Sequence, residues 1–158
     1  VMNASGCGAT VKDYGHALAG DPAYADKAAR ISALTRDLSE LLPELVPALK
    51  ALLNRSRTRQ QAMDAQQVPL AYHPSCTLQT APVDSHLCCG SAGTYSVLQP
   101  VLSQQLRDRK LKALSAVTAD TIVSGNIGCI QHLQTGSDRP VRHWVEVLDE
   151  TLSAVTHG

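Results

Sequence analysis

Two adjacent cysteines that run directly into glycines, Cys88 and Cys89 before Gly90 and Gly93, constrain the fold of this chain more than any other feature. Neighbouring Cα atoms lie only about 3.8 Å apart, so two thiols that face one target need an unusual backbone. Glycine supplies such a backbone because it lacks a Cβ atom. Packing alone would use one cysteine at most. We therefore expect this turn to hold a metal or to carry out redox chemistry.

The three remaining cysteines, Cys7, Cys76 and Cys129, also stand in loops marked by glycine or proline. Buried free cysteines that act as small hydrophobes are the simplest alternative to a metal site. A disulfide framework is disfavoured, because five is an odd number, no signal peptide opens the chain and a domain of this length needs no covalent staples.

The composition limits the kinds of molecule that this chain is expected to bind. The 158 residues are enough for one domain with a core. Fourteen basic residues balance fourteen acidic residues and the aromatic content is 3%, so the chain offers neither charge nor stacking surface for nucleic acid. The most apolar stretch, 41–53, contains Pro, Glu and Lys and is too short to span a bilayer. We expect a soluble protein without a transmembrane segment, docked onto something larger.

The sequence pattern of the first half of the chain predicts helices. Asp21 and Pro22 resemble a helix cap followed by proline at the first helical position. Apolar residues then recur at helical spacing over 25–42, which predicts one long amphipathic helix or two joined helices. Pro43 and Pro47 interrupt this pattern, and the polar stretch 55–67 is interpreted as a surface connection.

The second half alternates between helical and strand patterns. Two short apolar runs, 68–72 and 121–123, predict buried strands that each lead into a cysteine loop. Further elements are expected as a helix at 101–114, a strand at 141–143 and a helix at 144–155. This order predicts an α/β fold with a small, open, mostly parallel sheet flanked by helices. Because ligands in such sheets lie beyond the carboxyl ends of the strands, Cys76 and Cys129 should emerge on one edge.

An internal repeat divides the chain. Residues 3–8 resemble 124–129, because both lead through small residues into Gly-Cys. We expect 1–20 to be the tail of a preceding cysteine-rich repeat and 21–158 to be a second, C-terminal cysteine-rich domain. The start at Val1, with loop residues already at position 3, is typical of a piece of a longer polypeptide.

An ordered set of motifs resembles a known family. The motifs are ASGCG (4–8), YG (14–15), YADKA (24–28), CTLQ (76–79), DSHLCCGSAGTY (84–95), QLRD (105–108), NIGC (126–129) and VRHW (141–144). Together they resemble the cysteine-rich CCG domain, and within that family the second copy found in iron-sulfur subunits of glycolate oxidase. The resemblance covers nearly the whole chain.

The resemblance implies an electron-transfer subunit. Such a subunit carries electrons from a flavin-containing partner, which holds the FAD and oxidises a 2-hydroxy acid, towards an acceptor such as quinone. It does not touch the substrate, and it is cytoplasmic, peripheral on the inner membrane through its complex. The ferredoxin-like N-terminal region of a complete subunit is missing from this chain, so we expect no turnover from this piece alone.

The resemblance also implies a ligand set for an iron-sulfur cluster of the 4Fe-4S type. The corresponding residues are Cys76, Cys88, Cys89 and Cys129. Where the family closes with Cys-x-x-Cys, this chain has His132, which could ligate iron or simply be hydrogen-bonded near a helix start. Cys7 would serve a cluster of the preceding copy.

A second departure from the family lies between Cys76 and Cys88. The eleven residues between them cannot hold a crossover helix, a further strand and their turns, because a parallel crossover needs about a dozen residues or more. We expect a shortened domain near 79–82, through a natural deletion or an omitted segment.

Other groups near the cysteines have secondary roles. Helices that start near Ser91 and Gly128 would lower the pKa of nearby thiols through their dipoles. His73 and His86 could donate hydrogen bonds to sulfur, with helix capping or surface placement as alternatives. The segment 90–94 lacks the spacing and the lysine of a P-loop, which argues against nucleotide binding.

Three alternatives to an electron carrier stay open. Thiolates together with His132 would also satisfy tetrahedral zinc, which gives a structural zinc module. A metal-free docking module would use the helices at 22–53 and 144–155 as partner surfaces. A thiol-disulfide enzyme is the weakest of the three, because the cysteine pair is not Cys-x-x-Cys and vicinal disulfides are strained.

Overall fold

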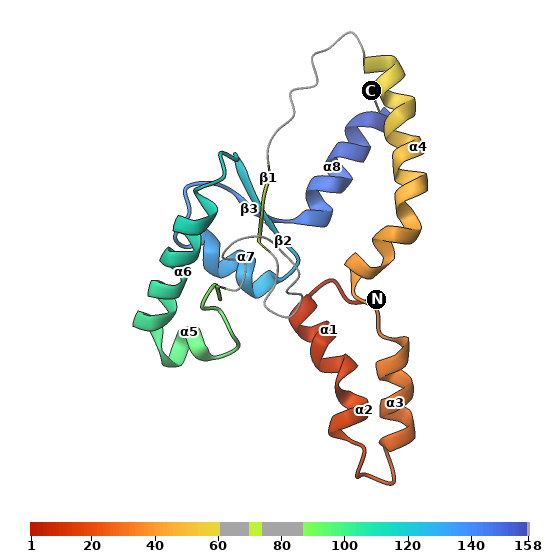
Figure 1. The fold of residues 1–158 in the computed structure, drawn as a ribbon, viewed down its shortest axis with the longest axis vertical. Coiled ribbons are helices and arrows are strands. Elements are labelled where there is room, and N and C mark those ends of the chain that lie inside the picture. Colours follow the sequence, from red (N-terminus) through yellow and green to blue (C-terminus); the bar gives the residue numbers. More distant parts are fainter. Residues whose placement is uncertain (61–69, 74–86, 158) are drawn as a thin grey trace.

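The computed structural model describes residues 1–60, 70–73 and 87–157, with the side chains of 55–60 and 155–157 left aside. In chain order the elements are α1 (Ser5–Lys12), α2 (Tyr14–Ala17), α3 (Ala25–Leu34), a 3-10 helix η1 (Leu38–Leu41), α4 (Leu42–Gln60), β1 (Leu70–His73), α5 (Tyr95–Leu98), α6 (Pro100–Leu114), β2 (Thr121–Ser124), α7 (Ile127–Gln134), β3 (Val141–His143) and α8 (Trp144–His157). Figure 1 shows their arrangement.

A parallel three-stranded sheet lies at the centre of the second half. The strand order is β1-β2-β3, and both pairings are parallel. His73 lies opposite Ser124 on β2, and Ser124 lies opposite His143 on β3. The predicted fold class, a small open parallel sheet flanked by helices, is confirmed, and so are the helices and strands expected after residue 100.

The core is formed where α6 and α7 cover this sheet. Ile122 on β2 and Leu133 on α7 have no exposed surface, and Val141 on β3 is 6% exposed. Leu114 at the end of α6 and Cys129 on α7 join the same buried cluster. The apolar strand β2 is short because four residues suffice to cross this small core, which α7 then closes on the way to β3.

The N-terminal helices form an arm that projects away from the sheet (Figure 1). The predicted helix start at Pro22 is wrong, since α3 begins at Ala25. Asp21 instead closes a turn: its side chain accepts from the Ala23 N–H at 2.8 Å, and its carbonyl accepts from the Tyr24 and Ala25 N–H groups. The cap therefore serves the turn before the helix.

Helix α4 differs from two further predictions made from the sequence. Pro43 and Pro47 do not interrupt it, and it continues through 55–60, where the polar sequence predicts a surface connection. Pro43 lies in the first turn, where backbone N–H groups have no intrahelical acceptor, so only Pro47 removes a helical hydrogen bond. Residues 61–67 lie outside the described part of the chain.

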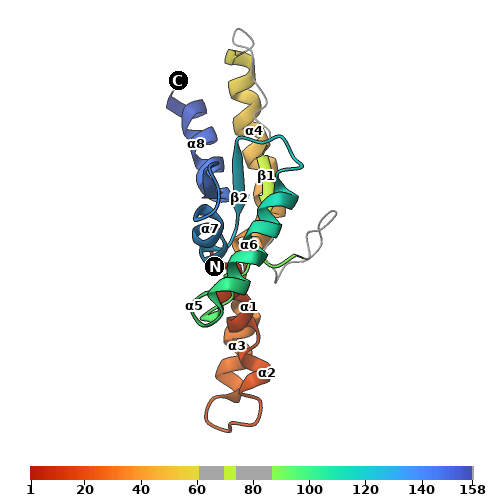
Figure 2. The same ribbon diagram turned by 90° about the vertical axis from the view of Figure 1, so that its left-hand side faces the viewer.

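Two long helices, α4 and α8, lie together at the other end of the molecule. Helices α4 and α8 contact each other, and Figure 2 shows that they lie at the end opposite the arm of α2 and α3. None of the helices in the described ranges is long and apolar enough to cross a membrane.

We predict that Leu133→Ala lowers the free energy of unfolding by about 2–5 kcal/mol, because it leaves a cavity in a fully buried site. The control is Leu34→Ala, where the side chain is 70% exposed and the expected loss is below about 0.5 kcal/mol. Urea unfolding followed by circular dichroism measures both. Equal losses would show that α7 does not anchor the core.

Candidate metal centre

The site forms where β2 leads into α7. Asn126 caps α7 by accepting a hydrogen bond from the Gly128 N–H at 2.9 Å. This cap fixes the first turn, so that Cys129 points inward and is only 4% exposed. A thiol in the first turn of a helix lies in the positive field of the helix N-terminus, which favours its thiolate.

The second half of the site is the turn that carries the cysteine pair. Gly90 has φ +87°, and a Cβ atom there would lie 2.4 Å from the Ser103 carbonyl oxygen on α6. The Ser103 hydroxyl donates to the Gly90 carbonyl at 2.7 Å. Glycine is therefore required, because it allows the turn to lie directly on α6. The result is that Cys89 is 1% exposed, whereas Cys88 is half-buried and accepts a hydrogen bond from the Gly90 N–H at 3.3 Å.

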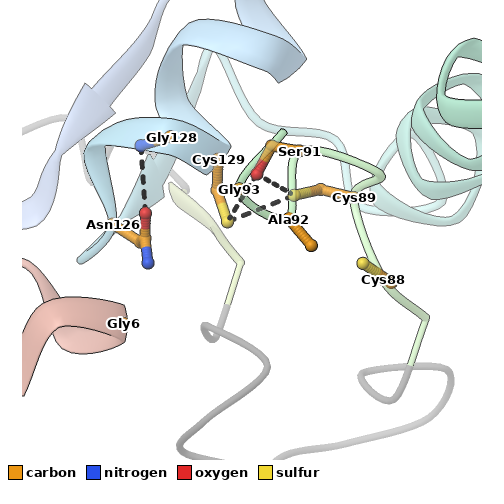
Figure 3. Close-up of a pocket in the computed structure, with 9 residues that line it drawn as sticks. All are labelled: Gly6, Cys88, Cys89, Ser91, Ala92, Gly93, Asn126, Gly128 and Cys129. Carbon is orange, nitrogen blue, oxygen red and sulfur yellow. Dashed lines mark hydrogen bonds between the residues drawn. The ribbon is translucent and has the colours of Figure 1, made fainter. Parts of the chain in front are cut away.

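The two cysteine segments meet sulfur to sulfur. Cys89 Sγ and Cys129 Sγ lie 3.1 Å apart, although 40 residues separate them in the chain. The Ser91 hydroxyl lies 3.2 Å from Cys89 Sγ and 3.8 Å from Cys129 Sγ. Figure 3 shows these groups facing one another, with Cys88 at the edge of the same pocket. The pocket has a volume of about 240 Å³, and its lining includes Cys88, Cys89 and Cys129.

This arrangement favours a thiolate at Cys89. The hydrogen bond with Cys129 lowers the pKa of the Cys89 thiol well below its usual value, and hydrogen bonds from Ser91 add to this effect, while burial opposes it. The nearby His73 ring acts in the same direction as Ser91. A thiolate is the form that binds metal.

His73 lies inside the site rather than beside it. It ends β1 and its side chain is fully buried. One of its ring nitrogens lies within 4.8 Å of the sulfur atoms of Cys89 and Cys129. Among the residues that the structure describes, neither ring nitrogen has a hydrogen-bond partner. The sequence predicts His73 as a possible hydrogen-bond donor to sulfur, with helix capping or surface placement as alternatives. The parallel pairing of β1 with β2 brings it to the sulfurs.

The structure places His132 against Ser103. Its Nε2 lies 3.0 Å from the Ser103 Oγ and 3.3 Å from the Ser103 carbonyl oxygen. Because the only hydroxyl proton of Ser103 is donated to Gly90, His132 Nε2 must be the donor in both contacts. His132 is thus not in the buried group of three potential ligands. Ser103 was not anticipated, since no local sequence signal marks a contact between distant helices.

The remaining predicted residues are Cys7, Cys76 and His86. Cys7 is exposed on α1, although its neighbour Gly6 lines the pocket. Cys76 and His86 lie outside the described residues. The helix expected near Ser91 begins at Tyr95 as the short α5.

Comparison with known proteins supports the resemblance read from the motifs. Residues 77–134 match the CCG family, described as a cysteine-rich domain. The glycolate oxidase iron-sulfur subunit of Escherichia coli (strain K12) is 41% identical over 96% of this chain and 39% of its own length. Lactate utilization protein A of Geobacillus thermodenitrificans (strain NG80-2) is 28% identical over 94% of this chain and 69% of its own length.

A third relative has the same character. The probable glycolate oxidase iron-sulfur subunit of Bacillus subtilis (strain 168) is 29% identical over 88% of this chain and 34% of its own length. The chain therefore spans little more than a third of the length of the two glycolate oxidase subunits that it matches. No solved structure matches the chain.

We predict that Gly90→Ala disrupts the site, because its Cβ would meet the Ser103 backbone and its φ is positive. The free energy of unfolding should fall by about 3 kcal/mol or more. Gly93→Ala is the matched control: its φ is also positive, at +50°, but no atom lies within 4 Å of the added Cβ, so the loss should be about 1–2 kcal/mol. Urea unfolding measures both, and equal losses would contradict the close approach to Ser103.

We predict that the metal-free chain keeps a thiolate at a pH well below about 8.5, the pKa of an ordinary cysteine, and that Cys89→Ser removes it. Titration of the thiolate absorbance measures this. Cys129→Ala should raise the pKa of Cys89 by removing its hydrogen-bond partner, whereas Cys129→Ser should keep it low. A titration unchanged by Cys129→Ala would refute the cause assigned here.

The same shift has a consequence for stability. The pKa of Cys89 is lower in the folded than in the unfolded chain, so the unfolded chain binds more protons between the two pKa values. The metal-free chain should therefore become more stable as the pH rises through that window, and lose this contribution as the pH falls towards the lowered pKa.

Proposed function

We propose that this chain, in which a CCG cysteine-rich domain is present, is the C-terminal part of an iron-sulfur subunit in a 2-hydroxy-acid oxidising complex. In this role it passes electrons from a flavin-bearing subunit towards a quinone-type acceptor. The observation that carries the proposal is the meeting of Cys89 Sγ and Cys129 Sγ at 3.1 Å, with Cys88 lining the same pocket. The similarity to a glycolate oxidase iron-sulfur subunit supports it.

The groups present fit an iron-sulfur centre. Thiolates are the usual ligands of such centres, and three cysteines line one pocket while the fully buried His73 ring beside them has no normal hydrogen-bond partner. We propose Cys88, Cys89 and Cys129 as ligands together with Cys76, which follows β1 in the chain. An iron-sulfur centre supplies one-electron transfer.

The protein around the sulfurs has two roles in this proposal. The Gly90 N–H donates to Cys88 Sγ and the Ser91 hydroxyl lies against Cys89 Sγ, and hydrogen bonds to ligand sulfur tune the reduction potential. Burial of Cys89 and Cys129 keeps water from the inner ligands. The half-buried Cys88 leaves one side of the pocket open, where electrons could enter from a partner subunit.

The pocket suits an electron carrier better than a substrate site. Its described lining offers thiol, hydroxyl and amide groups, with no Lys, Arg or His side chain. A 2-hydroxy acid carries a carboxylate, which binding sites normally hold through a cation. This supports a subunit that does not itself bind the substrate.

Residues 1–20 fit the proposed tail of a preceding repeat. The Ser5 N–H donates to the Gly125 carbonyl at 3.3 Å, and a Cβ atom at Gly6 would lie 2.9 Å from the Asn126 side-chain nitrogen. The two Gly-Cys loops therefore lie side by side. In this proposal Cys7 serves the preceding repeat. Because its loop lies next to the second site, electrons would have only a short path between the repeats.

A structural zinc module is the second candidate. The observation that favours it is that the buried sulfur pair and the imidazole ring beside it form a compact set of nitrogen and sulfur donors, which zinc binds well.

We predict that the chain purified without oxygen contains iron and sulfide in near-stoichiometric amounts and shows the visible absorption of an iron-sulfur centre. Cys89→Ser should lose most of the iron, because it removes a buried ligand, while Cys7→Ser on the exposed face of α1 should keep it. Analysis of iron, sulfide and zinc per chain is the measurement. Zinc without sulfide would favour the second candidate, and a chain without metal would contradict both.

A further inference from the structure

His73 is an unexplained group in the core of the site. Its side chain is fully buried, and neither ring nitrogen has a hydrogen-bond partner within the described ranges of the chain. Buried polar groups are nearly always paired, and a buried polar group without a partner destabilises the fold. A ring in this state requires a partner, and its neighbours are the sulfurs of Cys89 and Cys129.

The geometry suits coordination of one ion by all three side chains. With metal–sulfur bonds of about 2.3 Å and metal–nitrogen bonds of about 2.0–2.1 Å, tetrahedral coordination puts ligand atoms about 3.5–3.8 Å apart. The sulfur atoms of Cys89 and Cys129 are 3.1 Å apart, and all ligand atoms of the group lie within 4.8 Å of one another. A small opening of the sulfur pair and a small approach of the ring would reach the required spacing.

The second ring nitrogen also has a possible partner. A ring that binds a metal through one nitrogen carries a proton on the other, and that proton is normally held by a neighbouring acceptor. Ser124 lies opposite His73 in the β1–β2 register, and its hydroxyl is buried without a partner as well. Coordination of His73 would allow a hydrogen bond to Ser124, so that one event could satisfy two buried groups.

The neighbouring histidine does not compete for this role. His132 Nε2 donates its proton to the Ser103 hydroxyl and carbonyl oxygens, and the ring lies outside the group of potential ligands. Its contacts serve the turn at Gly90 through Ser103. His132 is therefore a natural control for an experiment on His73.

We propose that His73 is a direct metal ligand, which with Cys89 and Cys129 gives the site mixed nitrogen and sulfur coordination. That the metal is iron of an iron-sulfur centre rests on the function proposed above. In the centre proposed above, which has four cysteines as candidate ligands, His73 would take the place of one of their thiolates. A neutral imidazole ligand makes such a centre less negative, and histidine ligation raises the reduction potential of iron-sulfur centres. The role of His73 in this chain is then to set the potential at which electrons are accepted.

The test uses Co²⁺ as a probe of the metal-free chain under anaerobic conditions. Wild type should show a sulfur-to-cobalt absorption band and one strongly shifted, exchangeable imidazole N–H resonance in its proton NMR spectrum. His73→Ala should lose that resonance and bind Co²⁺ roughly tenfold more weakly or worse, while His132→Ala should keep the resonance. A wild-type complex without a shifted imidazole resonance, a resonance that survives in His73→Ala, or no binding of Co²⁺ would overturn the proposal.

Two further measurements cover a folding defect in His73→Ala. His73→Cys should restore tight Co²⁺ binding with a stronger sulfur band and no imidazole resonance, because it returns a ligand to the same position. In wild type itself, labelling of the histidines with ¹⁵N shows, without any substitution, whether the shifted resonance belongs to a histidine ring. Failure of His73→Cys to recover binding, in a chain with native circular dichroism, would also count against ligation.

Failure of this inference can be told apart from failure of the proposed function. If the chain holds iron and sulfide but pulsed EPR of its paramagnetic state shows no nitrogen coupling, the proposed electron-transfer function is supported and the proposal that His73 is a ligand is rejected. If the Co²⁺ complex shows the imidazole resonance but the chain retains no iron and sulfide, the proposal that His73 is a ligand is supported and the proposed electron-transfer function is rejected.

Discussion

The parallel pairing of β1 with β2 is the constraint on which the rest of the site depends. Because both strands run in the same direction, the segments after them leave from one edge of the sheet. That edge brings the end of β1, at His73, next to Ser124 and to the start of α7. The core under the sheet, with Ile122 and Leu133 fully buried, holds this edge rigid, and the capped turn of α7 carries Cys129 into it.

A second constraint acts through backbone contact. Gly90 lies so close to Ser103 that no side chain fits between them, and the Ser103 hydroxyl links the turn to His132 on α7. Helices α6 and α7 and the cysteine turn are therefore connected by one chain of hydrogen bonds. These hydrogen bonds position Cys89 through the folding of the domain alone, so that the metal centre proposed above would not have to order this ligand.

The electrostatics of the site follow from these two constraints. Two buried sulfur atoms in contact share a hydrogen bond, which favours a thiolate at Cys89, and the buried ring of His73 lies beside them. Such an arrangement is costly in a protein that only needs a core, where apolar side chains would pack more simply. It is understandable in a protein whose buried sulfurs serve a metal centre.

The sequence by itself determined the elements after residue 100, the class of sheet and the importance of the cysteine pair, because apolar periodicity and glycine next to cysteine are local signals. It did not determine the true start of α3 or the helical continuation through 55–60, since a turn can use the same Asp21 that would cap a helix and a polar helix has no apolar period. Only the tertiary structure decided which histidine joins the sulfurs. His73 and Cys129 are far apart in the chain, and their contact depends on strand register, whereas His132, three residues from Cys129, is turned by the helix towards Ser103. Local spacing cannot specify which residue meets which across a sheet, because that is fixed by the packing of the whole core.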